Sequence, residues 1–96
     1  MVKSLLQRNK ACYICGTTLN LHTHHVFFGY SSKNRDYSDA DGCVVYLCLY
    51  HHTGAQGVHN NRKLDLTLKA RCQIEWQKHY SKTTEDFIKR YGKSYL

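Results

Sequence analysis

The segment CVVYLCLYHH, residues 43–52, contains the clearest β-strand pattern in the chain and ends in a pair of histidines. Its first six residues are apolar, β-branched or aromatic, which predicts a buried strand. Gly54 and Gly57 follow soon afterwards. A helix that begins behind Cys48 is therefore expected to be short, because glycine disfavours helix interiors.

A partner strand is predicted upstream, over residues 21–28, where a mixed run of β-branched and aromatic residues ends at Gly29. Between the two strands, residues 30–42 are polar and rich in Asp, Ser, Asn and Gly, which is typical of a loop. Two strands joined in this way form a hairpin, and long hairpin loops often carry function. Residues 4–10 are short and polar, and they are expected to form one helical turn.

Downstream of the hairpin, apolar residues recur every four positions with charged residues between them. This pattern predicts an amphipathic helix that packs one stripe against the hairpin. Thr83 or Thr84 can cap a last short helix, which Gly92 would close. The stripe consists of Leu64, Leu68, Cys72, Trp76 and Tyr80.

The chain is expected to form one compact domain over residues 1–96, because it contains no Pro and no long Gly/Ser stretch. The core of that domain is predicted at residues 10–61, and a helical extension at residues 62–96. No signal-peptide or membrane-span pattern occurs, which predicts a soluble, cytoplasmic protein. In a reducing compartment, five cysteines favour thiols or thiolate ligands over disulfides.

The charge balance indicates the kind of partner. Fourteen Lys and Arg stand against seven Asp and Glu, so the formal net charge is +7. Such a charge attracts polyanions, whose counterions are released on binding. Nucleic acid is therefore the expected partner, and the alternative is a generally basic protein without an anionic ligand.

Two short cysteine-containing motifs predict a metal site. Cys12-x-x-Cys15 and Cys48-x-x-His51 together offer three sulfurs and one nitrogen, a tetrahedral ligand set that suits zinc. A redox C-x-x-C pair is the alternative, but it would require a βαβ pattern that this sequence lacks. Zinc binding at such a site would contribute folding free energy.

The remaining histidines exceed what one structural zinc needs, and with the cysteines they carry a family resemblance. The chain resembles the HNH family of endonucleases over residues 10–60. This resemblance implies an α+β, ββα-metal fold, in which a hairpin and a helix hold one divalent cation over the scissile phosphate. It also suggests a phage source, and hence the host cytoplasm. The residues that carry it are Cys12-x-x-Cys15, His24-His25 and Val44-Val-Tyr-Leu-Cys48-x-x-His51-His52.

The resemblance implies a role for each histidine. His25 corresponds to the general base, His24 to the first-strand metal ligand and His52 to the helix ligand. The usual second helix ligand falls on Gln56, a poor ligand, so His59 is the expected substitute. Seven helical residues rise about 10 Å, too far for two imidazoles to share an ion, so the chain between them must fold back.

Two further points concern the loop and the strand. Cys43 occupies the place of the family's loop-bracing asparagine, so Asp39, Asp41 or Asn60 is expected to brace the loop, and Cys43 is interpreted as a core residue. Strand alternation puts His22 on the face of His24 and opposite to His25. A twist or bulge near Gly29 would bring both His24 and His25 to the site, as the family pattern favours.

The expected function is therefore metal-dependent hydrolysis of DNA phosphodiester bonds. His25 would take a proton from water, while a cation held by His24, His52 and His59 would stabilise the leaving oxygen. The residues leave the cation open among Mg²⁺, Mn²⁺, Ni²⁺, Co²⁺ and Zn²⁺, and the oligomeric state open between monomer and homodimer. Phosphate contacts with weak sequence preference are expected from Lys33, Arg35, Arg62, Lys63 and Lys69.

Two other functions compete with this one. A catalytically degenerate zinc module of the same fold would bind DNA or a protein partner, and Cys43 and Gln56 favour it. A plain zinc-ribbon DNA reader would use only the ligands of the zinc knuckle. It would leave His24, His25, His52 and His59 unexplained.

Overall fold

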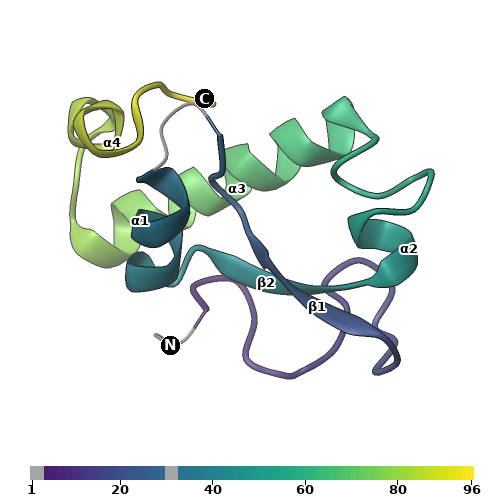
Figure 1. Ribbon diagram of the computed structural model, residues 1–96. Helices are drawn as coiled ribbons and strands as arrows, with labels where there is room; N and C mark the ends of the chain where they lie inside the picture. Colours follow the sequence, from purple (N-terminus) through teal and green to yellow (C-terminus); the bar gives the residue numbers. More distant parts are fainter. Residues whose placement is uncertain (1–3, 30–32) are drawn as a thin grey trace.

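The computed structural model describes residues 4–29 and 33–96 (Figure 1). Within these residues a two-stranded sheet and four helices form a small α+β fold. Helices α1 and α4 lie at one end of the molecule and α2 at the other, and α3 spans the distance between them (Figure 1). In chain order the elements are β1 (Leu21–His25), α1 (Asn34–Asp41), β2 (Val44–Cys48), α2 (Leu49–His52), α3 (Arg62–Tyr80) and α4 (Thr84–Tyr91).

The two predicted strands are confirmed and pair as an antiparallel hairpin. Their register runs one to one, from Leu21 opposite Cys48 to His25 opposite Val44. Strand β1 ends three residues earlier than predicted. Val26 still donates to the Cys43 carbonyl at 2.9 Å, but the Cys43 N–H bonds to Ser38 instead, so the ladder ends there. Val26 and Phe27 are each 0% exposed and belong to the core.

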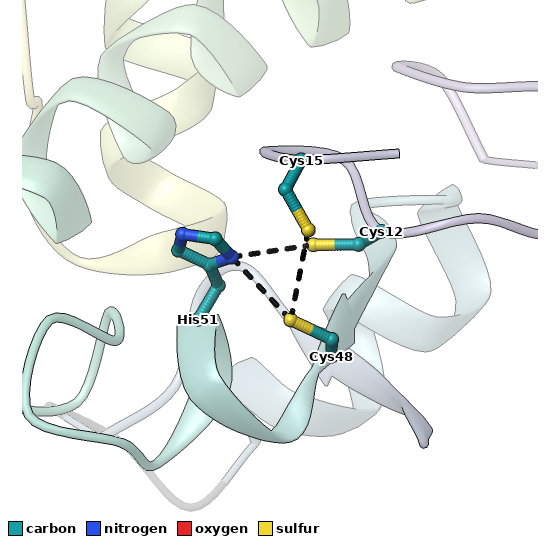
Figure 2. Close-up of side chains that lie close together, drawn as sticks. All are labelled: Cys12, Cys15, Cys48 and His51. Atoms are coloured by element: carbon teal, nitrogen blue, oxygen red, sulfur yellow. Dashed lines mark hydrogen bonds between the residues drawn. The ribbon is translucent and has the colours of Figure 1, made fainter. Parts of the chain in front are cut away.

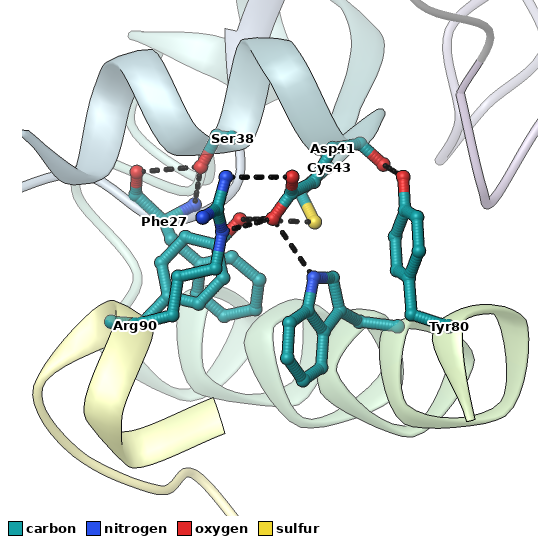
Figure 3. A network of polar contacts seen from close by, with 8 residues as sticks. Phe27, Ser38, Asp41, Cys43, Tyr80 and Arg90 are labelled. Atoms are coloured by element: carbon teal, nitrogen blue, oxygen red, sulfur yellow. Dashed lines mark hydrogen bonds and ion pairs between the residues drawn. The ribbon is translucent and has the colours of Figure 1, made fainter. Parts of the chain in front are cut away.

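The segment predicted as a loop, residues 30–42, contains helix α1 instead, apart from residues 30–32, which lie outside the described part. Its polar residues have weak helix propensity, so tertiary contacts stabilise the helix. The Ser38 hydroxyl donates to the Phe27 carbonyl at 2.8 Å and accepts from the Phe27 N–H at 3.1 Å (Figure 3). Gly42 ends the helix in a left-handed conformation (φ 81°), and its N–H donates to the Ser38 carbonyl. The Asp and Ser residues that predicted a loop therefore lie in a helix.

The expected helical turn over residues 4–10 is not formed. This segment lies instead along the edge of β2 that β1 leaves free. The Gln7 side-chain oxygen accepts from the Tyr46 N–H at 2.6 Å, and the Leu5 N–H donates to the Gly42 carbonyl at 2.9 Å. The segment therefore forms hydrogen bonds with the free edge of the sheet instead of the hydrogen bonds of a helical turn.

The two predicted C-terminal helices are confirmed, and the predicted apolar stripe of α3 faces the core, although Lys69 and Gln73 are buried in the same helix. In α3 the side chains of Leu68, Cys72 and Trp76 are buried, and Leu64 and Tyr80 pack partly buried against the same core. Thr83 caps α4 in a reciprocal capping box with Asp86, and Gly92 follows the end of the helix with φ 98°. Among the described residues no helix combines the length and apolarity that a membrane span requires.

A buried carboxylate holds the C-terminal helices against the end of α1 (Figure 3). Asp41 accepts hydrogen bonds from Trp76 Nε1 at 2.9 Å and from the Tyr91 hydroxyl at 2.8 Å. It also forms a two-point ion pair with Arg90, with distances of 2.6 and 2.8 Å. Of the candidate braces, Asp41 therefore joins helices α1, α3 and α4, whereas Asn60 bonds the Thr53 and Gly54 carbonyls and braces the turn after α2.

Candidate metal centres

The first Cys/His group has the dimensions of a zinc site (Figure 2). The four ligand atoms of Cys12, Cys15, Cys48 and His51 all lie within 4.8 Å of one another. The Cys15–Cys48 Sγ separation is 3.8 Å, and His51 Nδ1 lies 3.8 Å from Cys12 Sγ and 3.4 Å from Cys48 Sγ. A tetrahedron with zinc–sulfur bonds of about 2.3 Å has edges of about 3.8 Å, so these residues fit zinc.

Local backbone structure positions this group. The Gly16 N–H donates to the Cys12 carbonyl at 2.8 Å, and Gly16 adopts φ 80°, so a tight turn that suits glycine follows the two cysteines. The Tyr13 N–H donates to the Tyr46 carbonyl at 2.8 Å and fastens the turn to β2. Cys48 ends β2 and His51 lies in α2, so the second pair spans a strand-to-helix junction.

The thiols of this group favour a bound cation. Burial acts to raise the pKa of Cys12, but backbone N–H groups of Cys48, Cys15 and Ile14 outweigh it and lower the pKa to about 6. At Cys15 a backbone hydrogen bond from Thr17 lowers the pKa, but desolvation and the adjacent sulfurs raise it overall. One thiolate is thus present near neutral pH, and crowding opposes the next unless a cation compensates its charge.

The second group consists of three imidazoles, from His24, His52 and His59, whose ligand atoms also lie within 4.8 Å of one another. The Nε2 atoms of His52 and His59 are 3.1 Å apart. Ligand nitrogens on one ion, with bonds of about 2.1 Å, lie about 3.0–3.4 Å apart. His24 Nε2 is buried and has no hydrogen-bond partner among the described residues. Because such an orphaned atom is costly, a cation there would satisfy it.

Two imidazoles of the cluster, those of His24 and His52, are held in the neutral form that metal ligation requires. Burial, and then the neighbouring His52 and His59, lower the pKa of His24 to about 3. Burial and His59 also lower the pKa of His52. Both imidazoles therefore keep a free lone pair at pH 7.

The chain folds back between His52 and His59, which confirms the predicted turn. The Val58 N–H donates to the His51 carbonyl at 3.0 Å, and the His59 N–H to the His52 carbonyl at 3.3 Å. Gly57 is required at this close approach, because a Cβ atom there would lie 2.5 Å from the His52 carbonyl oxygen. The turn brings His59 next to His24 and His52 across seven residues.

Gly57→Ala is therefore expected to weaken metal binding at the histidine cluster. Overpacking typically costs about 1–3 kcal/mol, and displacement of His59 would transmit this cost to the site as an affinity loss of about tenfold. Isothermal titration with Ni²⁺ into zinc-loaded protein measures it. Ala55→Ser, in the exposed part of the same turn, is the matched control and should titrate like the wild type. Equal affinities for all three proteins would contradict the role of the turn.

The structure separates the adjacent histidines of β1. The one-to-one register includes no bulge within the strand, and Gly29, at φ 69°, lies beyond it. The expected distortion that would turn both His24 and His25 to one cleft is thus not seen in β1. His25 Nε2 lies 3.6 Å from Asp39 Oδ1, whereas His22 Nδ1 lies 3.0 Å from His52 Nδ1. In the sequence, the alternation of side chains along the strand already predicted that His22 shares a face with His24.

The expected phosphate-binding residues divide into two groups. Arg62 and Lys63 are exposed in the first turn of α3 and line a shallow depression, and Lys33 and Arg35 are also exposed. Lys69 differs from this expectation, because its side chain is only 9% exposed and lies 2.8 Å from Asp65. Its ammonium group also lies 4.2 Å from the centre of the Phe28 ring, so Lys69 is part of the interior.

Comparison of the chain with protein-family models, with curated proteins and with solved structures gave no match. The kind of site can therefore be judged only from the residues that form it. These are a Cys₃His group with zinc-site dimensions and a separate three-histidine group with a buried, unpaired nitrogen.

Proposed function

We propose that the protein is a metal-dependent endonuclease of the HNH type that hydrolyses DNA phosphodiester bonds. The observation that carries this proposal is the convergence of His24, His52 and His59 from β1, α2 and the following turn. Because His24 Nε2 is buried without a partner in the described part of the chain, the cluster is poorly explained as a packing feature. The hairpin followed by α2 would then be the ββα-metal core.

The two metal groups have separate tasks in this proposal. The Cys₃His group would hold a structural zinc, since its four protein ligands leave no open position. The three-histidine group leaves coordination positions for phosphate oxygens. A divalent cation bound there, whether Mg²⁺, Mn²⁺, Ni²⁺, Co²⁺ or Zn²⁺, supplies Lewis-acid stabilisation of the leaving oxygen and orients the phosphate.

His25 is the proposed general base. It is the last residue of β1 and follows the proposed metal ligand His24 in the chain, on the opposite face of the strand, with 20% of its side chain exposed. A neutral imidazole can take a proton from water near pH 7. The Asp39 carboxylate, 3.6 Å from His25 Nε2, would stabilise the imidazolium that forms, leaving Nδ1 to meet the water.

DNA binding in this proposal rests on exposed cations near the histidine cluster, and Arg62 and Lys63 follow His59 closely in the chain. Each neutralised phosphate contact lowers the slope of log affinity against log salt by about 0.9. The Arg62→Gln/Lys63→Gln variant is therefore expected to lose about two units of that slope, as fluorescence anisotropy on a DNA duplex would measure. Lys78→Gln/Lys89→Gln, with two exposed cations elsewhere, should keep the wild-type slope, and equal losses in both variants would count against this surface.

The hydrolytic step is tested by nicking of supercoiled plasmid. Zinc-loaded protein is stripped of other cations, and Mg²⁺, Mn²⁺, Ni²⁺ or Co²⁺ is added in turn. We expect His25→Ala to lower the nicking rate by about 10²-fold or more, the usual contribution of a general base. His79→Ala, which removes an exposed histidine of α3, should nick like the wild type. If both variants and the wild type nick equally feebly, the activity is a contaminant.

The second candidate function is a catalytically degenerate module of the same fold that binds DNA or a protein partner. Cys43 favours it, because this residue is 0% exposed and its Sγ lies 3.6 Å from the Tyr91 hydroxyl oxygen, which makes it a core residue. Gln56 is exposed in the turn. Salt-sensitive DNA binding without nicking under any of the cations would establish this function instead.

A further inference from the structure

We propose that His22 is a positioning residue for the three-histidine site, and that it selects the metal-binding tautomer of His52. This inference rests on the proposed function, because it concerns the same cation. His22 Nδ1 lies 3.0 Å from His52 Nδ1, with the two rings edge to face at 78°. The other ring nitrogen of His52 lies 3.1 Å from His59 Nε2.

The proton count of neutral imidazole makes this contact informative. Each neutral ring has one N–H donor and one acceptor nitrogen. Two ring nitrogens at 3.0 Å share one hydrogen, because two lone pairs or two N–H groups would repel each other. When His52 Nδ1 carries that hydrogen and His22 accepts it, His52 Nε2 has a free lone pair on the side of His59. The opposite assignment puts a hydrogen on His52 Nε2 and blocks the cation.

Metal binding by His52 is therefore coupled to the hydrogen bond that His22 accepts from His52 Nδ1. Metal-ligating histidines generally donate their other N–H to a fixed acceptor, which sets the tautomer and raises the basicity of the ligand. His52 is partly buried in the four-residue helix α2, and the rings of His24 and His59 pack against it at centroid distances of 5.3 and 4.7 Å. These contacts limit the ring's position, whereas the contact at Nδ1 is made with His22. His22, in β1 and on the face of His24, supplies that acceptor.

The contact also argues against His22 as a further ligand of the same ion. His22 approaches Nδ1 of His52, whereas His59 approaches Nε2 of the same ring. The three-histidine group that shares one centre consists of His24, His52 and His59. In addition, His22 is exposed, so its replacement should leave the core intact.

The test compares His22→Phe with His22→Gln in zinc-loaded protein titrated with Ni²⁺. Phenylalanine keeps a planar ring but removes the acceptor, whereas the glutamine side-chain oxygen can accept the hydrogen bond. We expect His22→Phe to raise the dissociation constant of Ni²⁺ about 10–100-fold, the usual effect of losing such a partner. His22→Gln should restore most of the affinity. His79→Phe, on the exposed surface of α3, is the matched control and should bind Ni²⁺ like the wild type.

Two spectroscopic measurements separate positioning from a merely structural or ligating role. Long-range ¹H–¹⁵N spectra should show His52 as the Nδ1–H tautomer in wild type and a shifted tautomer ratio in metal-free His22→Phe. X-ray absorption at the nickel edge should show the same number of histidine ligands in both proteins. A lower histidine count in His22→Phe would make His22 a ligand and overturn the proposal, as would an unchanged affinity.

The results also distinguish this inference from the proposed function. Wild-type protein that binds Ni²⁺ with the His22 dependence but does not nick DNA would overturn the nuclease and keep the inference. Nicking by His22→Phe should recover at saturating Ni²⁺, whereas His25→Ala should stay inactive. Wild-type protein that takes up none of Mg²⁺, Mn²⁺, Ni²⁺, Co²⁺ and Zn²⁺ at the histidine cluster would overturn both.

Discussion

Cys48→Ser is expected to abolish the folding of the zinc-dependent part of the protein. Structural zinc contributes about 10–16 kcal/mol of binding free energy in small zinc peptides at pH 7. The whole stability of a domain is about 5–15 kcal/mol. Loss of one ligand of the Cys₃His group should therefore remove an amount comparable to all of the stability.

The structure gives a reason to expect that the N-terminal region depends on a zinc ion at this group. The described residues before β1 contain no helix or strand, and they attach to β2 by a few hydrogen bonds such as that from Tyr13 to Tyr46. Cys12 and Cys15 lie in this region, while Cys48 and His51 lie at the end of the hairpin. Zinc would thus connect a segment of little structure of its own to the sheet.

The measurement combines a zinc count by native mass spectrometry with the dispersion of amide signals in NMR spectra. Wild-type protein should hold a zinc at the Cys₃His group, and Cys48→Ser should lose it together with the dispersed signals of β1 and β2. Cys72→Ala, which alters a buried cysteine outside that group, should keep the ion and lose only packing energy. A Cys48→Ser protein with unchanged dispersion and unfolding midpoint would refute the structural role of the ion.

Asp41→Asn is expected to lower the free energy of unfolding by about 3 kcal/mol. Loss of one partner from a buried ion pair costs about 3–5 kcal/mol. The lower end applies because 34% of the Arg90 side chain is exposed, whereas only 12% of the Asp41 side chain is. An asparagine of the same shape removes the charge and leaves Arg90 without its ionic partner. Its amide nitrogen would also face the donors Trp76 Nε1 and Tyr91 OH.

Urea denaturation of the zinc-loaded protein measures this loss. Asp39→Asn is the control, because it makes the same change in the same helix at a side chain that is 52% exposed, where effects within about 0.5 kcal/mol are usual. The double variant Asp41→Asn/Arg90→Met should regain part of the loss, since it removes the unpaired cation. If Asp41→Asn and Asp39→Asn shift stability equally, the network does not hold α3 and α4 to α1.

The helix α1 and the position of Lys69 show where sequence patterns fail. The residues of α1 favour turns locally, and the helix forms because Ser38 bonds to Phe27 and because Asp41 is fixed by α3 and α4. Lys69 follows the charged pattern of a helix surface, yet Asp65 and the Phe28 ring enclose its ammonium group. Both outcomes depend on partners that are distant in the chain.

The sequence by itself determined the features that depend on neighbouring residues. These are the apolar strand at residues 43–48, the four-residue period of α3, the Thr83 cap of α4 and the pairing of Cys12-x-x-Cys15 with Cys48-x-x-His51. The need for a turn before His59 also followed from helix geometry alone. The strand, the helix period and the cap are local because propensity and periodicity act over a few residues. The pairing of the two metal motifs is long-range, and it was predictable because four ligands of this kind complete one tetrahedral zinc site.

Only the tertiary structure decided which histidines face one another. The regular register of β1 and β2 put His22 on the face of His24, directed His25 toward Asp39 and left His24 Nε2 buried without a partner among the described residues. The physical reason is that side-chain direction in a strand changes with each residue. A single bulge in β1 would therefore have changed which histidines share a face with His24. The local sequence pattern does not show whether the strand contains a bulge.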